Sequence, residues 1–239
     1  MLVWAPGDGG SDGPILHRLT GHTGVIFRLA LSPGRDTLLS CSDDRSVRRW
    51  RRVGGEWSRA APEALFGHEA RVWAALPVSG DRFVSVGEDS RVCLWSADGR
   101  LERRWRAHGG ASVRAAAVDP TGRRLATGGG DGAVLVWPLT GPPAPPRLLP
   151  TAGGDRARSL APLDGHRQLL VTDFGRLLLL RRTDGDGGHA SSDGEVTSDV
   201  VLDDPLARLA SYALLAVGPD RRWVAVAGRH GHIITLKTG

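Results

Sequence analysis

Short runs of apolar residues recur along the chain, and clusters of glycine, proline, aspartate and serine separate them. In the segment 25–50, VIFRLALS and TLLSCS are joined by an SPGRD turn, and a tight turn at Asp43-Asp44 leads into SVRRW. Runs of this length between turn-forming residues are typical of antiparallel β-strands. The longest uninterrupted aliphatic stretch is Leu177 to Leu180, far below the roughly 18 apolar residues of a membrane span. The pattern therefore predicts an all-β chain without a membrane segment.

Three segments align with one another, at residues 21–50, 67–95 and 107–137. In each, a histidine precedes an aspartate by 21 to 23 residues, a Ser or Thr lies four residues before that aspartate, and a tryptophan follows it by six. The recurring residues are His22, Ser40, Asp44 and Trp50; His68, Ser85, Asp89 and Trp95; and His108, Thr127, Asp131 and Trp137. Self-similarity at a fixed interval is the signature of a repeat architecture.

This pattern resembles the WD-repeat family, in which Gly-His opens each unit and Trp closes its third strand. The resemblance implies a β-propeller with one four-stranded blade per repeat, and a hydrogen-bonded set of the four recurring side chains inside each blade. Buried polar groups must be mutually satisfied, so we expect these sets to be structural. The stretch GHEARVW begins like a zinc-protease motif, but Val72 stands where the second histidine would be. His68 is therefore expected to brace a turn.

The repeat continues more weakly after residue 137. Around 168–180, Phe174 stands at the Asp position and Leu180 at the Trp position, and around 223–236 His230 and Leu236 do so. We expect a single partial propeller over 1–239, with degenerate blades at about 155–182 and 205–237. That gives about five blades, fewer than the seven usual in the family, and thus an incomplete ring or a fragment of a seven-bladed propeller.

Catalytic motifs are not found: the sequence has no GxSxG, P-loop or HExxH pattern, so we expect no enzyme activity, no metal and no bound cofactor. Cys41 and Cys93 lie in strand-like runs without CxxC spacing and are expected to be buried, reduced thiols. Segments 140–154 and 183–195 are interpreted as a proline-stiffened connection and a solvated acidic linker.

Arginine supplies nearly all of the positive charge. The net charge is +5, and of 31 basic residues only Lys237 is lysine. Arginine suits bidentate contacts with phosphate, so RNA is a permitted partner. Alanine, glycine and proline are abundant as well, which a GC-rich coding sequence also produces, and the charge alone leaves both explanations open.

Four residues at the starts of the first strands are candidates for contact with a partner or RNA: Phe27, Arg71, Trp73 and Arg114. Side chains alternate along a strand, so these residues should point away from Ile26, Val72 and Val113, which are expected to face the packing between blades. In WD-repeat proteins such positions lie at the rim of the central channel. Aromatic and arginine side chains dominate interface hot spots and stack on unpaired bases. The alternative that Phe27 and Trp73 simply pack between blades stays open.

A closer resemblance covers roughly residues 15–237. GHTGVIFRLALS, LFGHEARVWAALP, SLAPLDGHRQLLVTDFGRLLLL and SYALLAVGPD are similar to successive parts of the WD-repeat regulatory subunits of FtsJ-type tRNA wobble-position 2′-O-methyltransferases. This resemblance implies a non-catalytic cytoplasmic scaffold that binds the methyltransferase and tRNA, with S-adenosylmethionine bound by the partner enzyme. The chain matches the later part of the first propeller of these longer proteins. The alternative is a general protein-interaction propeller, a substrate receptor or trafficking scaffold, without an RNA role.

Overall fold

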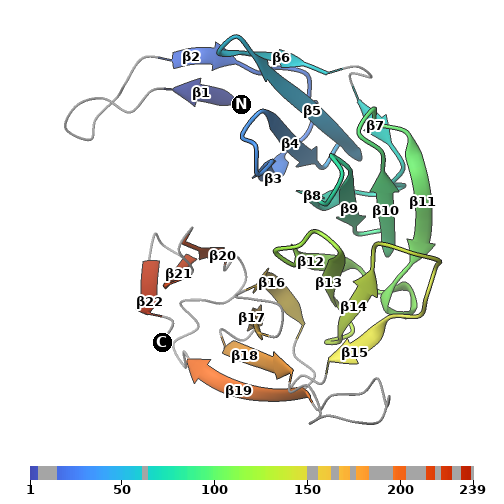
Figure 1. Ribbon diagram of the computed structural model, residues 1–239, viewed down its shortest axis with the longest axis vertical. Coiled ribbons are helices and arrows are strands. Elements are labelled where there is room, and N and C mark those ends of the chain that lie inside the picture. Colours follow the sequence, from blue (N-terminus) through green and yellow to red (C-terminus); the bar gives the residue numbers. More distant parts are fainter. Residues whose placement is uncertain are drawn as a thin grey trace. The chain divides into compact units, whose positions relative to one another are not determined.

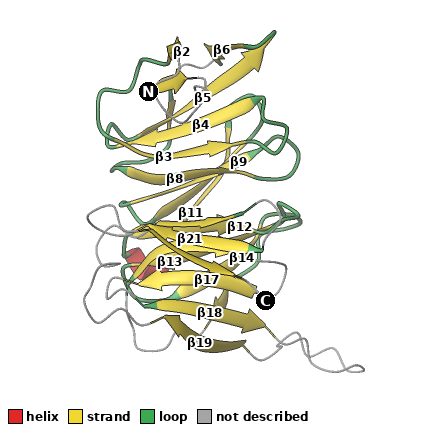
Figure 2. Cartoon of the chain, turned by 90° about the vertical axis from the view of Figure 1, so that its left-hand side faces the viewer, coloured by secondary structure: helices red, strands yellow, loops and turns green. Residues whose placement is uncertain are grey.

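Strands dominate the chain in the computed structural model, which describes residues 1–4, 15–60, 64–149, 156–162, 167–172, 176–182, 196–202, 214–218, 222–227 and 233–237. Figure 2 shows the strands in yellow and, in red, the short 3₁₀ helix η1 (His108–Gly110). No helix within these ranges is long and apolar enough to cross a membrane. The prediction of an all-β WD-repeat propeller is confirmed.

The chain divides into two compact units, 1–85 with 93–104, and 86–92 with 105–239. In the first unit, a two-stranded sheet comprises β1 (Leu2–Trp4) and β2 (Ile15–Arg18). The next sheet comprises β3 (Ile26–Leu31), β4 (Thr37–Ser42), β5 (Ser46–Val53), β6 (Glu56–Arg59) and β7 (Leu65–Phe66). In it, β6 and β7 both pair with β5.

A four-stranded sheet follows along the chain. It comprises β8 (Val72–Pro77), β9 (Phe83–Gly87), β10 (Arg91–Trp95) and β11 (Leu101–Arg106). Its strands lie side by side in the order in which they follow one another along the chain (Figure 1). This up-and-down order is the arrangement of a propeller blade.

Three sheets lie wholly in the second unit. The first comprises β12 (Val113–Val118), β13 (Arg124–Gly129), β14 (Val134–Pro138) and β15 (Arg147–Leu149). The second comprises β16 (Ala157–Pro162), β17 (Arg167–Thr172), β18 (Leu177–Arg182) and β19 (Val196–Leu202). The third comprises β20 (Leu214–Val217), β21 (Trp223–Ala227) and β22 (Ile233–Lys237).

Two fourth strands were missed by the sequence pattern. The segment 140–154 contains β15, in which Leu149 pairs with Val134 and is buried, so part of the expected connection is a strand. β19 lies outside both of the expected degenerate segments and pairs with β18 from Leu177 to Arg182. Outer strands carry few buried residues, and a short or polar strand therefore leaves little hydrophobic pattern to detect. The segment 183–195 lies outside the described residues.

Each unit has its own apolar core. In the first unit, Cys41, Val47, Val72, Cys93 and Trp95 belong to one cluster of buried side chains. In the second, one cluster joins residues of β12–β14 to β16 and β18, and another joins β16 and β18 to β20 and β21. Burial of apolar area at about 25 cal/mol per Å² is the main force that holds such sheets face to face.

The degenerate repeats replace the closing tryptophan with an aliphatic side chain. Leu180 is 1% exposed within the cluster shared with β12–β14, and Leu236 packs against the cluster of β20 and β21. Both side chains fill core volume, but neither offers the N–H group of an indole. Phe174 and His230, expected at the Asp position, lie outside the described residues.

Candidate interaction surface

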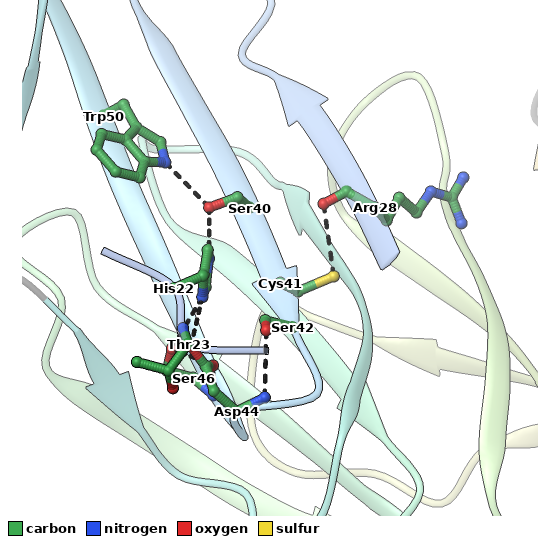
Figure 3. A network of polar contacts seen from close by, with 9 residues as sticks. All are labelled: His22, Thr23, Arg28, Ser40, Cys41, Ser42, Asp44, Ser46 and Trp50. Atoms are coloured by element: carbon green, nitrogen blue, oxygen red, sulfur yellow. Dashed lines mark hydrogen bonds and ion pairs between the residues drawn. The ribbon is translucent and has the colours of Figure 1, made fainter. Parts of the chain in front are cut away.

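Four side chains from different parts of the first clear repeat meet inside the β3–β7 sheet (Figure 3). His22 Nδ1 lies 2.8 Å from Asp44 Oδ2, and His22 Nε2 lies 2.8 Å from Ser40 Oγ. Trp50 Nε1 donates to the same Ser40 oxygen over 3.0 Å. A contiguous chain of hydrogen bonds therefore runs from the turn after β4 to the middle of β5.

The direction of each hydrogen bond follows from what each group can donate. An indole N–H can only donate and a carboxylate can only accept, so the Ser40 hydroxyl accepts from Trp50. His22 Nδ1 then carries the proton and donates to Asp44. Both ring nitrogens of His22 are thus engaged within the chain, and neither is available to a metal or substrate.

Asp44 also shapes the turn that follows it. Its Oδ1 accepts from the backbone N–H and the hydroxyl of Ser46, and its Oδ2 accepts from the N–H of Thr23. Burial opposes ionisation, but these hydrogen bonds and the one from His22 outweigh it and hold the pKa of Asp44 well below its usual range. Arg45 follows in the left-handed region with φ of 67°, a conformation that the fixed turn imposes.

The same geometry occurs in the other two clear repeats. Ser85 Oγ lies 2.8 Å from His68 Nε2 and accepts from Trp95 Nε1 over 2.9 Å. Thr127 Oγ1 likewise lies 2.9 Å from His108 Nε2 and accepts from Trp137 Nε1 over 2.8 Å.

The turn aspartates of these repeats act on the backbone as Asp44 does. Asp131 Oδ1 lies 3.0 Å from His108 Nδ1 and accepts from the N–H of Ala133. Asp89 Oδ1 accepts from the N–H of Arg91. The recurring side chains therefore form hydrogen bonds within the chain, and any binding at the surface must involve other side chains.

His108 gives the chain a pH-dependent contribution to stability. Burial lowers the pKa of His108, and the nearby Asp131 carboxylate only partly offsets this effect. In the unfolded chain the His108 imidazole takes up a proton near pH 6.5, whereas in the folded chain it does so only at lower pH. The free energy of unfolding should therefore fall as pH drops below about 6.5. Urea unfolding of the wild type and of His108→Gln at pH 7.5 and pH 5.5 measures this contribution. Equal pH dependence in the two proteins would contradict the assignment.

Both cysteines are buried and reduced in the structure. Cys41 is 0% exposed, and burial raises the pKa of its thiol to about 12. A thiol that stays protonated at neutral pH is a poor nucleophile and a poor metal ligand. Within the described residues no group of three or more His, Cys, Asp or Glu side chains could hold a metal ion.

The first strand of three sheets starts with a β-bulge, which sequence reasoning did not foresee. The pairing register shifts between Ile26 and Arg28, between Val113 and Ala115, and between Ala157 and Ser159. The residues inside these shifts are Phe27, Arg114 and Arg158. A bulge bends the strand and re-aims a side chain, so the simple alternation expected for these positions is interrupted. Arg158 was missed because its repeat is degenerate; its place after Arg156 and Ala157 could have revealed it.

Three of the four candidate surface residues meet in the first unit. The rings of Phe27 on β3 and Trp73 on β8 are 4.5 Å apart between centroids, and both side chains are half-buried. The Arg71 guanidinium lies 5.6 Å from the centroid of Trp73, and its Nε is 3.3 Å from Asp43 Oδ1. The Arg71 side chain is 47% exposed. The result is an aromatic pair edged by an accessible arginine, which we call the aromatic–arginine cluster (Phe27, Arg71 and Trp73).

Arg114 lies in the second unit, on β12, where its guanidinium is 3.5 Å from Glu88 Oε1. Its side chain is 27% exposed. Arg114 is thus partly accessible, and its charge is shared with a carboxylate. The ion pairs of Arg71 and Arg114 were not predicted, because the spacing of the repeats does not show which acid lies beside which arginine.

Comparison with known proteins identifies the repeats. The family described as WD domain, G-beta repeat matches residues 13–51, 62–96 and 99–138. One chain in a crystal structure of the mitotic checkpoint complex superimposes with a TM-score of 0.71 and 22% identity, over 94% of this chain and 65% of that one. At that level of identity the likeness establishes the fold alone.

Two curated relatives carry the same printed name, "tRNA (34-2'-O)-methyltransferase regulator WDR6". The Mus musculus protein is 32% identical over 235 residues, which cover 92% of this chain and 19% of the relative. The Drosophila melanogaster protein is 37% identical over 107 residues, which cover 42% of this chain and 11% of the relative. The chain thus spans about a fifth of the length of the mouse relative. The chain is a member of the WD-repeat β-propeller proteins, and most of its length is similar to part of these tRNA methyltransferase regulators.

Proposed function

We propose that the protein is a non-catalytic WD-repeat scaffold that assists 2′-O-methylation of the ribose at the anticodon wobble position of tRNA. In this role it binds an FtsJ-type methyltransferase and tRNA in the cytoplasm. The methyltransferase supplies the S-adenosylmethionine site and the chemistry, and the propeller surface holds enzyme and tRNA together. This chain would form one part of a longer protein that carries out the whole task.

The extent of the similarity carries this proposal. The three WD40 matches end at residue 138, whereas the similarity to the mouse regulator covers 92% of the chain. A relationship confined to the general features of WD repeats would fade where the closing tryptophan is replaced by Leu180 and Leu236. Continuation through these atypical strands favours the regulators over propellers in general.

The charge and the surface are consistent with an RNA partner. The net charge is +5 and nearly all basic residues are arginines. In the aromatic–arginine cluster, an exposed guanidinium adjoins two half-buried rings. Guanidinium groups bind phosphates bidentately, and aromatic rings stack on unpaired bases such as those of an anticodon loop.

Deletion of the full-length gene tests the proposal. We expect 2′-O-methylation at the wobble nucleotide to be lost while methylation at other positions persists, and we expect a tagged protein to co-purify with the methyltransferase. An unchanged wobble mark, with no methyltransferase recovered, would reject the proposal in favour of a general interaction propeller.

Arg71→Ala in the full-length protein should weaken capture of the methyltransferase or tRNA several-fold. It should change the free energy of unfolding by less than about 0.5 kcal/mol, because the Arg71 side chain is a surface group. Arg52→Ala is a matched control, because Arg52 is an exposed arginine elsewhere in the same unit. Pull-down yields and thermal melting measure the two effects. Equal binding by the two variants would show that the aromatic–arginine cluster is not part of the interface.

A further inference from the structure

An acid–arginine pair recurs beside the turn aspartate. Asp43, immediately before Asp44, pairs with Arg71 over 3.3 Å. Glu88, immediately before Asp89, pairs with Arg114 over 3.5 Å. Arg71 stands directly before the first strand of the next repeat, β8, and Arg114 is the second residue of the corresponding strand, β12. The acid therefore neutralises a guanidinium at the same edge in two successive repeats.

The third repeat breaks this pattern. Gly130 stands immediately before Asp131, where the other repeats have Asp43 and Glu88. The next first strand, β16, is nevertheless preceded by Arg156, the counterpart of Arg71, and has Arg158, the counterpart of Arg114, as its second residue. Glycine at this position has no carboxylate. The third repeat therefore keeps an arginine at the next first strand but lacks the acid beside the turn aspartate.

A hollow adjoins the position of the missing acid. A hollow of about 380 Å³ in the second unit is lined by Gly130 and Arg156 together with Glu88, Arg114, Ser112 and the Gly110–Ala111 turn. A Cβ atom built on Gly130 would lie 3.3 Å from Ser112 Oγ, which places that hydroxyl beside the vacant position. The lining side chains carry two guanidinium groups against one carboxylate and include a hydroxyl that can donate a hydrogen bond.

We propose that this hollow binds a phosphate group of the RNA backbone, held by Arg156 and Arg114 with a hydrogen bond from Ser112. The assignment deepens and rests on the proposed tRNA function. Two guanidinium groups and a hydroxyl around one opening supply the bidentate and single donors that a phosphate accepts. The volume exceeds that of one water molecule, about 30 Å³, by an order of magnitude, so a phosphate fits with its adjoining sugar outside.

Gly130→Asp in the full-length protein restores the acid, and Gly130→Asn is its control of equal size without the charge. Fluorescence anisotropy with tRNA at several salt concentrations should show affinity about tenfold weaker for the Asp variant, and a salt dependence with a slope smaller by about one. The Asn variant should stay within about twofold of the wild type, and thermal melting should show both variants folded. Equal affinities for the Asp and Asn variants would overturn the proposal.

Binding of a small anion tests this site independently of the proposed tRNA function. If the wild type binds no tRNA, the tRNA part of the proposed function fails. Inorganic pyrophosphate then tests the anion site directly: it should raise the melting temperature of the wild type and the Asn variant but not of the Asp variant. No such difference would overturn the anion site. If Gly130→Asp instead lost capture of the methyltransferase without RNA, the hollow would be assigned to an acidic protein side chain, and the RNA phosphate would be rejected.

Discussion

Thr127→Val is expected to lower the free energy of unfolding by roughly 2 to 6 kcal/mol, although valine has nearly the same shape as threonine. The Thr127 hydroxyl accepts from Trp137 Nε1 over 2.8 Å and lies 2.9 Å from His108 Nε2, at a position that is 0% exposed. Valine would leave an indole N–H and an imidazole nitrogen buried without their partner. Each such group carries a desolvation cost of about 1 to 3 kcal/mol.

Thr127→Ser is the matched control, because it keeps the hydroxyl and removes only a methyl group. It should cost about 1 kcal/mol. Chemical denaturation of both variants measures the difference. If valine were tolerated as well as serine, the Thr127 hydroxyl would have no part in stabilising the repeat, and the shared geometry of the three repeats would need another explanation.

Gly67→Ala is expected to destabilise the protein by about 2 to 3 kcal/mol by overpacking. A Cβ atom on Gly67 would lie 2.7 and 2.8 Å from ring atoms of Trp95 and 3.3 Å from Cys93 Sγ. Trp95 is stacked on Phe83 with centroids 5.8 Å apart and is 2% exposed, so the ring has little room to move. Its displacement would also break the hydrogen bond to Ser85. The lack of a side chain at Gly67 is thus explained by the ring that closes its repeat.

Gly34→Ala provides the comparison for this substitution. A Cβ atom there would meet Asp36 Oδ1 at 3.6 Å, an ordinary contact on an exposed turn. It should change the free energy of unfolding by less than about 0.5 kcal/mol. Similar melting temperatures for the Gly67 and Gly34 variants would show that the core around Trp95 yields easily, contrary to the packing described above.

The inner strands of the sheets could be predicted from sequence, and some outer ones could not. Strands such as β4 and β9 are buried along most or all of their length, so they appear as mainly apolar runs between turns. β15 and β19 are held by backbone pairing with β14 and β18 instead. Backbone pairing produces no pattern of hydrophobic residues in the sequence. The proline-rich sequence before β15 also argued against a strand there.

The recurring polar residues and the surface residues differ in how much the sequence reveals. The fixed offsets among His, Ser or Thr, Asp and Trp reflect one geometry that is used three times. The spacing in the sequence is therefore enough to predict that these side chains meet. The contacts of Phe27 with Trp73 and of Arg71 with Asp43 join residues of different repeats. They depend on how neighbouring sheets pack and on the bulge at Phe27, which no spacing encodes. The significance of Gly130 emerges only after the two ion pairs beside the other turns have been seen.

Reconstituted methyl transfer tests the central claim most directly. Purified methyltransferase, S-adenosylmethionine and tRNA would be combined with and without the full-length protein, and 2′-O-methylation of nucleotide 34, the position printed in the names of the relatives, would be followed in time. We expect no methyl transfer by the protein alone and a several-fold faster reaction when it is added to the enzyme. An equal rate in its absence would contradict the role of a regulatory scaffold.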